Sequence, residues 1–153
     1  MKKISFLLLL LSQPAFGDSP RIWLDINWFS WHSDDTYVDN GVVKEFNENN
    51  PGMFARYEIK RNLDIGAGMF KHSYGEWTPA FGFEIHTRRD RGLSIGAIVG
   101  YAPGYKETPA NTILFVLPVA QAQLPGSPTI GLRAGYMPFG EVKFGTVQVT
   151  FGF

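Results

Sequence analysis

Apolar residues alternate with polar or small residues along most of the chain after about residue 20. In segment 63–72, Leu63, Ile65 and Met69 share one face of an extended strand, and Asp64 and Gly66 share the other. The same two-residue period recurs in several segments of about ten residues, and no segment keeps a helical period. The predicted strands are 22–32, 52–60, 63–72, 76–86, 93–101, 112–124, 129–136 and 142–153. The pattern therefore predicts an all-β fold, an eight-stranded antiparallel barrel.

The two faces of these strands differ in side-chain size. In segment 76–86, Phe81, Phe83 and Ile85 lie on one face, and Ala80 and Gly82 lie on the other. A glycine-rich face cannot form the polar coat of a soluble barrel, so we expect the large apolar side chains to face lipid. Strands of about ten residues have the length of a tilted membrane strand. A soluble periplasmic barrel is the alternative, and it predicts extraction without detergent.

The first residues have the pattern of a secretory signal peptide. Lys2 and Lys3 precede an apolar run at 4–11, and Ala15 and Gly17 supply small residues for cleavage. The run is far shorter than the about 20 apolar residues of a spanning helix. We therefore expect 1–17 to be a signal peptide and 18–153 to form the barrel. A last segment that alternates up to Phe153 is typical of barrels that the insertion machinery places in the bacterial outer membrane, where we expect the chain to be a monomer.

Charge and cysteine content exclude some classes of protein. The chain has 14 basic and 14 acidic residues and no cysteine. No basic stripe is present, so a nucleic-acid partner is not expected. An exported soluble domain often relies on disulfides, and this chain has none to form. Outer-membrane lipids are the partners that the lipid-facing pattern predicts instead.

The residues expected inside the barrel leave space in the lumen. An eight-stranded barrel has a narrow lumen that is filled by side chains or shaped for one small ligand. Glycines and apolar side chains on the inner faces would suit an acyl chain. The predicted lumen residues are Gly66, Gly68, Phe70, Gly82, Gly96 and Ile98. The same glycines could instead only relieve crowding in a strongly curved sheet, and both interpretations stay open.

Two histidines and a serine end predicted strands at the same rim. His32 ends the first strand, and His72 and Ser73 end the third. A histidine can act as a general base near neutral pH, and a neighbouring hydroxyl can be activated by it or can hold a reacting group. A rim histidine can also be an interface residue without catalytic function. No third ligand stands at a suitable spacing for a metal ion, so no metal is expected.

Short motifs along the chain occur in the order found in a known family. They are Trp31-His32, Phe46-Asn47-Glu48, Phe70-Lys71-His72-Ser73, Trp77-Thr78-Pro79, 114–118 with Pro118, and Tyr136-Met137-Pro138. Over most of 28–153 the chain thus resembles the lipid A palmitoyltransferase (PagP) family. The resemblance implies an eight-stranded outer-membrane barrel that moves a palmitoyl chain from a phospholipid to lipid A without a cofactor. It implies His32 as the catalytic base, Ser73 as a supporting hydroxyl, and Pro118 and Pro138 beside a lateral path for lipid.

Two positions depart from the pattern of that family. His72 stands where the family has an aspartate, and an ungapped count places Glu84 where the family has a glycine at the floor of its acyl slot. A buried carboxylate is costly in an apolar slot, which argues against a pocket as long as a palmitoyl chain. The alternative is a non-enzymatic barrel that acts through its long acidic connection, 33–51, in surface interaction or masking.

Overall fold

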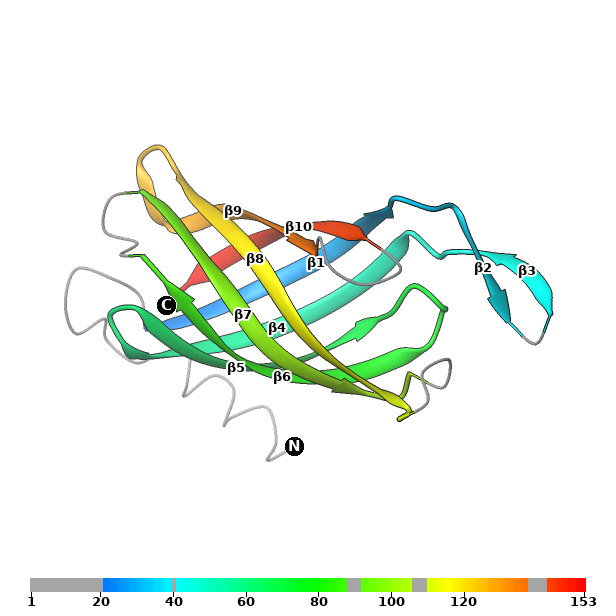
Figure 1. Ribbon diagram of the computed structural model, residues 1–153. Helices are drawn as coiled ribbons and strands as arrows, with labels where there is room; N and C mark the ends of the chain where they lie inside the picture. Colours follow the sequence, from blue (N-terminus) through cyan, green and yellow to red (C-terminus); the bar gives the residue numbers. More distant parts are fainter. Residues whose placement is uncertain (1–20, 40, 88–91, 106–109, 138–142) are drawn as a thin grey trace, which may run out of the picture.

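The computed structural model describes residues 21–39, 41–87, 92–105, 110–137 and 143–153, and these form a closed antiparallel barrel (Figure 1). Each barrel strand pairs with its neighbours along the chain, and β1 pairs with both β4 and β10 to close the sheet. The barrel strands are β1 (Ile22–His32), β4 (Asn49–Lys60), β5 (Leu63–Lys71), β6 (Trp77–His86), β7 (Leu93–Pro103), β8 (Thr112–Leu124), β9 (Ser127–Met137) and β10 (Phe144–Gly152). The predicted eight-stranded antiparallel barrel is confirmed. The described residues include no helix long and apolar enough to cross a membrane.

The long connection after β1 contains a hairpin that the sequence pattern did not predict. Strands β2 (Thr36–Asp39) and β3 (Val42–Glu45) pair with each other and extend beyond the end of the barrel opposite the C-terminus (Figure 1). Strand β4 begins at Asn49, earlier than predicted, because a shift in the β1–β4 register between Asn27 and Phe29 lets Phe29 pair with Asn49. Strand β5 ends at Lys71, so His72 and Ser73 lie in the turn that follows.

The barrel turns its large apolar side chains outward. Phe83 on β6 and Val99 on β7 are 52% and 54% exposed. Ala80 and Glu84, which lie on the opposite face of β6, are buried. This arrangement is the reverse of a soluble protein, and it is the pattern of a barrel whose outer face meets lipid. The predicted assignment of outward and inward faces is therefore confirmed for these strands.

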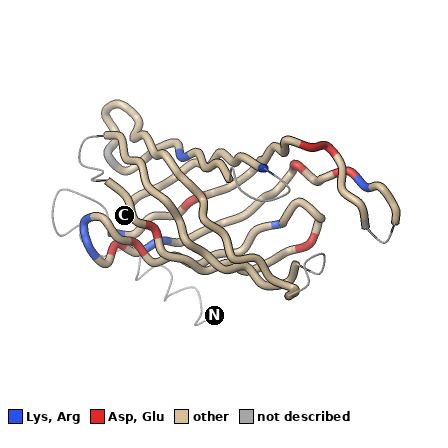
Figure 2. The backbone as a smooth tube through the Cα atoms, viewed as in Figure 1, with Lys and Arg blue, Asp and Glu red and all other residues tan. Residues whose placement is uncertain are grey.

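A cluster of charged side chains fills the half of the lumen nearer the C-terminus. The Nε of Arg56 lies 2.6 Å from a carboxylate oxygen of Asp25, and its Nη1 lies 3.0 Å from Asp64 and 3.1 Å from Glu84. Arg133 approaches Glu84 at 2.8 Å. All five side chains are buried, and they come from β1, β4, β5, β6 and β9; Figure 2 marks the charged positions along the backbone. Buried charges persist only when they are paired, so this cluster is the polar core of the barrel.

Candidate functional site

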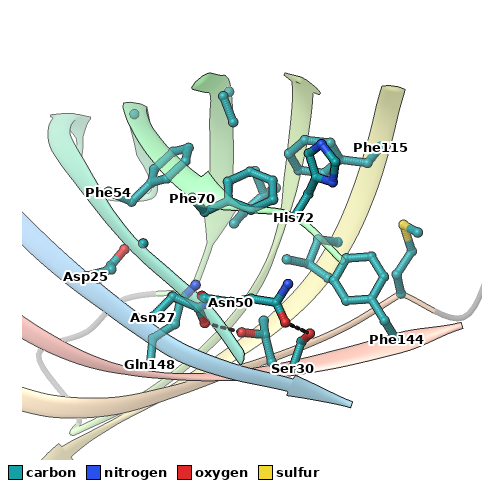
Figure 3. Close-up of a pocket in the computed structure, with 18 of the residues that line it drawn as sticks. Asp25, Asn27, Ser30, Asn50, Phe54, Phe70, His72, Phe115, Phe144 and Gln148 are labelled. Atoms are coloured by element: carbon teal, nitrogen blue, oxygen red, sulfur yellow. Dashed lines mark hydrogen bonds between the residues drawn. The ribbon is translucent and has the colours of Figure 1, made fainter. Parts of the chain in front are cut away.

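A cavity of about 190 Å³ lies in the lumen between the charged cluster and the end of the barrel that carries the β2–β3 hairpin. Apolar side chains line it, among them Phe54, Phe70, Phe115 and Phe144 (Figure 3). Arg56 and its partners form the inner end of the cavity. Sites for drug-sized ligands measure about 300–1,000 Å³, so this cavity fits a slender apolar chain of limited length.

The glycines expected in the lumen have two different surroundings. Gly66 and Gly82 line the cavity, together with Phe70 and Ile98. A Cβ atom on Gly68 would instead overlap the Met53 carbonyl and the Phe54 ring, and one on Gly96 would overlap the carbonyl of Ile85 and meet the His86 side chain. Gly68 and Gly96 therefore make room for neighbouring atoms. Gly66 and Gly82 line the cavity, and a Cβ atom on Gly82 would also lie 2.8 Å from the Val99 carbonyl oxygen.

His32 and Ser73 meet at the mouth of the cavity. The Nε2 of His32 lies 2.6 Å from the Oγ of Ser73, and both residues line the cavity. Strand β1 places His32 at its last position, and the turn after β5 carries Ser73. The sequence placed these residues at one rim, and the structure brings them into hydrogen-bond contact.

The segment that returns from β3 holds this pair in place. The Phe46 ring stacks on the His32 ring with centroids 4.6 Å apart and an angle of 12° between the planes. The backbone N–H of Asn47 donates to the carbonyl oxygen of Ser73 at 2.7 Å. The Nδ1 of His32 is buried and has no hydrogen-bond partner among the described residues. Stacking by Phe46 therefore orients the imidazole, a task that a carboxylate often performs in Ser-His pairs.

His72 lines the same mouth and is almost fully buried, with 1% of its surface exposed. Its ring stacks on Tyr105 at a centroid distance of 4.5 Å. The structure thus places all three rim residues singled out from the sequence, His32, His72 and Ser73, around one opening.

A polar belt below the mouth was not anticipated from the sequence. The Oγ of Ser30 donates to Asn50 Oδ1 at 2.6 Å (Figure 3). Asn50 Nδ2 donates to the Lys71 carbonyl at 2.9 Å. Asn27 Nδ2 donates to the Asn50 carbonyl at 2.6 Å. Asn27 and Ser30 both belong to β1, but they are three positions apart because the strand register shifts between them. A two-residue period therefore does not place them on one face, and their partner Asn50 lies on another strand. This belt fixes β1 to β4 next to the site.

The backbone ladder between β8 and β9 begins next to a proline. The first paired residues toward the mouth are Val119 and Gly135, directly after Pro118. A proline has no N–H to donate to the ladder. We call such an unpaired stretch between neighbouring strands a seam. Pro138, the second proline expected beside the path for lipid, lies outside the described residues.

A second seam lies between β6 and β7. Their ladder ends toward the mouth at Phe81 and Tyr101, and the same register continued by two positions sets Pro79 opposite Pro103. Neither proline can donate a ladder hydrogen bond. The hydroxyl of Thr78 instead donates to the Pro103 carbonyl. The sequence did not reveal this pair, because the strand register is needed to see that the two prolines face each other.

Comparisons with known proteins show the fold. No protein-family model matches the chain, and no curated protein matches it. A de novo designed transmembrane β-barrel superposes with a TM-score of 0.61 at 13% identity, covering 90% of this chain and 98% of the design. The solution structure of the designed barrel TMB2.3 gives 0.59 at 14% identity, with 90% and 98% covered. Ail, the attachment invasion locus protein of Yersinia pestis, gives 0.45 at 15% identity, with 88% and 98% covered. The chain therefore has the fold of a small transmembrane β-barrel.

Proposed function

We propose that this chain is a bacterial outer-membrane barrel that binds a lipid acyl chain in its lumen and transfers the acyl group at the His32–Ser73 pair. One observation carries the proposal. The 2.6 Å contact between His32 Nε2 and Ser73 Oγ stands at the mouth of an apolar cavity. A base within hydrogen-bond distance of a hydroxyl is the arrangement that activates an oxygen nucleophile.

The reaction follows from this arrangement. His32 Nε2 accepts the proton of Ser73 while Oγ attacks the carbonyl carbon of an ester whose acyl chain lies in the cavity. The bond between that carbon and the alcohol oxygen breaks, and His32 returns the proton to the leaving oxygen. A hydroxyl of the acceptor lipid then gives its proton to His32 and attacks the acyl-serine. The bond between the carbonyl carbon and Ser73 Oγ breaks, and His32 returns the proton to Oγ, which restores both residues. The family resemblance implies a phospholipid as donor and lipid A as acceptor.

Lipid would reach the cavity sideways from the bilayer. The seams at Pro118 and at the Pro79–Pro103 pair lack ladder hydrogen bonds next to the mouth. Strands without those bonds separate at lower cost than paired strands. Both seams therefore support lateral access to a site whose mouth is otherwise covered by aromatic side chains.

The proposal is tested by mass spectrometry of lipid A from a host that carries lipopolysaccharide, with and without expression of the chain. Expression of the wild type should add the mass of an acyl group, and Ser73→Ala or His32→Ala should abolish the gain. Ser127→Ala, at the opposite end of the barrel, is the matched control and should keep it. Heat-modifiable migration on a gel verifies that each variant is folded. A folded wild type that adds no acyl mass overturns the proposal.

A second candidate function rests on the β2–β3 hairpin. Val38, Val42 and Val43 are 70%, 57% and 65% exposed on a hairpin that extends beyond the barrel. Such a surface would suit a non-enzymatic role in surface interaction. Replacing these three valines with serine should then remove the change in surface interaction that expression of the chain causes, whereas His32→Ala should leave that change intact. The opposite pair of results favours acyl transfer.

A further inference from the structure

The hydrogen of the His72 ring has a defined position. The backbone N–H of Tyr74 donates to the Nδ1 of His72 at 3.2 Å. In a neutral imidazole one nitrogen carries the hydrogen and the other accepts. Since Nδ1 accepts, the hydrogen is on Nε2. In a doubly protonated ring Nδ1 would also carry a hydrogen, and that N–H would face the N–H of Tyr74. The hydrogen bond from Tyr74 therefore requires the neutral ring.

The turn after β5 holds this ring rigidly. The N–H of His72 donates to the Glu76 carbonyl and the N–H of Gly75 donates to the His72 carbonyl, each at 2.8 Å. Gly75 has a φ of 92°, a conformation that glycine adopts readily. Stacking on Tyr105 and an edge contact with Tyr74 at 5.6 Å cover the remaining faces of the ring. The direction of the Nε2–H bond is therefore fixed in advance of any ligand.

The His72 ring lies at the same mouth as the reactive pair. His72 precedes Ser73 in the chain, and both line the mouth of the cavity together with His32. When an ester carbonyl is attacked, its oxygen gains negative charge. Fixed donors aimed at that oxygen in a site that excludes water provide a large share of the stabilisation in acyl transfer.

We infer that His72 donates a hydrogen bond from Nε2 to the carbonyl oxygen of the ester attacked by Ser73 and stabilises its negative charge. The inference rests on the proposed function for the identity of the substrate. It also explains what a histidine can do at a position where the resembling family has an aspartate. An ionised aspartate accepts hydrogen bonds and donates none, so His72 performs a different task from the carboxylate whose position it occupies.

The ring itself can be tested without any activity. The chain has three histidines, and ¹⁵N-labelled protein in lipid nanodiscs allows each to be assigned by single replacement. His72 should show a protonated Nε2 and an unprotonated Nδ1. Reaction of Ser73 with a fluorophosphonate leaves a tetrahedral phosphonate that mimics the charged intermediate, and the His72 Nε2 proton should then move downfield. A ring that carries its hydrogen on Nδ1, or a proton resonance that does not move, overturns the inference.

Acyl transfer gives the second test. His72→Phe keeps an aromatic ring without a donor and should lower kcat by about 10²–10³, as loss of one such donor does elsewhere, with little change in KM. His72→Gln restores an N–H donor and should recover part of the rate. His72→Asp should be as impaired as His72→Phe.

A fully active His72→Phe, or a His72→Asp more active than wild type, overturns the role of His72 alone. A wild type that neither transfers acyl groups nor reacts with the fluorophosphonate overturns the proposed function as well.

Discussion

The Oγ of Ser73 lies 2.6 Å from the Nε2 of His32, although the two residues are 41 positions apart in the chain. The contact depends on the segment that returns from the β2–β3 hairpin. Phe46 stacks on the imidazole, and Asn47 donates its backbone N–H to the carbonyl of Ser73. The hairpin therefore belongs structurally to the site as well as to the outer surface.

Removing the stacked ring should reduce acyl transfer while the barrel stays folded. In Phe46→Ala the imidazole loses the surface that orients it, and a misplacement of about 1 Å can cost about 10²-fold in rate. We expect kcat to fall and KM to change little. Ile85→Ala, which removes a lipid-facing side chain that is 61% exposed, is the control and should keep its rate. Equal rates for the two variants would contradict this account of Phe46.

Filling the cavity should shorten the acyl chains that the protein transfers. Ile98 lines the cavity, and Phe at this position adds volume where the end of an acyl chain would lie. Wild type and Ile98→Phe can be given a mixture of phospholipids with different chain lengths, and the transferred chains identified by mass spectrometry.

Val99→Phe is the matched control for that experiment. The side chain of Val99 is the next along β7, points to lipid and is 54% exposed. It should leave the distribution of chain lengths unchanged. The same distribution for Ile98→Phe and wild type would mean that the acyl chain lies elsewhere.

Locking the seam between β6 and β7 should slow the reaction. The continued register sets Ala80 opposite Ala102, both buried, and the chain has no cysteine of its own. The oxidised double variant Ala80→Cys, Ala102→Cys should lose rate severalfold, because the strands can no longer separate, and a reductant should restore it.

A cross-link within the paired part of the same two strands provides the control. Ile85 pairs with Ala97, so Ile85→Cys with Ala97→Cys joins strands that are already bonded and should not alter the rate. If oxidation leaves the Ala80–Ala102 variant fully active, lipid does not pass between β6 and β7, and the seam at Pro118 becomes the candidate route.

Breaking the charged cluster should destabilise the barrel strongly. Arg56→Met leaves Asp25, Asp64 and Glu84 without one of their cationic partners, and removing one member of a buried ion pair costs about 3–5 kcal/mol. The free energy of unfolding in urea, measured in lipid vesicles, should fall by that amount. Lys60→Met, at the exposed end of the same strand, should change it by less than about 0.5 kcal/mol. Similar values for the two variants would show that the cluster contributes little to stability.

The faces of the strands could be predicted because alternation is a local property. Phe83 and Glu84 are neighbours, and a two-residue period already assigns one to lipid and the other to the lumen. The rim position of His32 and Ser73 followed from counting strands between them. These predictions needed no knowledge of which residues face each other across the sheet.

The remaining features depend on partners from distant strands. The sequence indicated that Glu84 would be a costly carboxylate in an apolar slot, whereas the structure pairs it with Arg133 and Arg56. Those partners lie on β9 and β4, and only the strand register aligns them with β6. The Pro79–Pro103 pair was missed for the same reason. The β2–β3 hairpin was missed because its four-residue strands are too short for a period to be read.

The charged cluster also constrains how the barrel assembles. Asp25 on β1 and Arg133 on β9 are 108 positions apart, yet an oxygen and a nitrogen of the two lie 3.4 Å from each other. A sheet that entered the bilayer before its first and last strands met would expose unneutralised charge to hydrocarbon, at a cost of several kcal/mol for each group. Insertion together with closure avoids that cost, so the cluster favours an order of assembly in which β1 meets its partner strands before the charged residues enter the hydrocarbon.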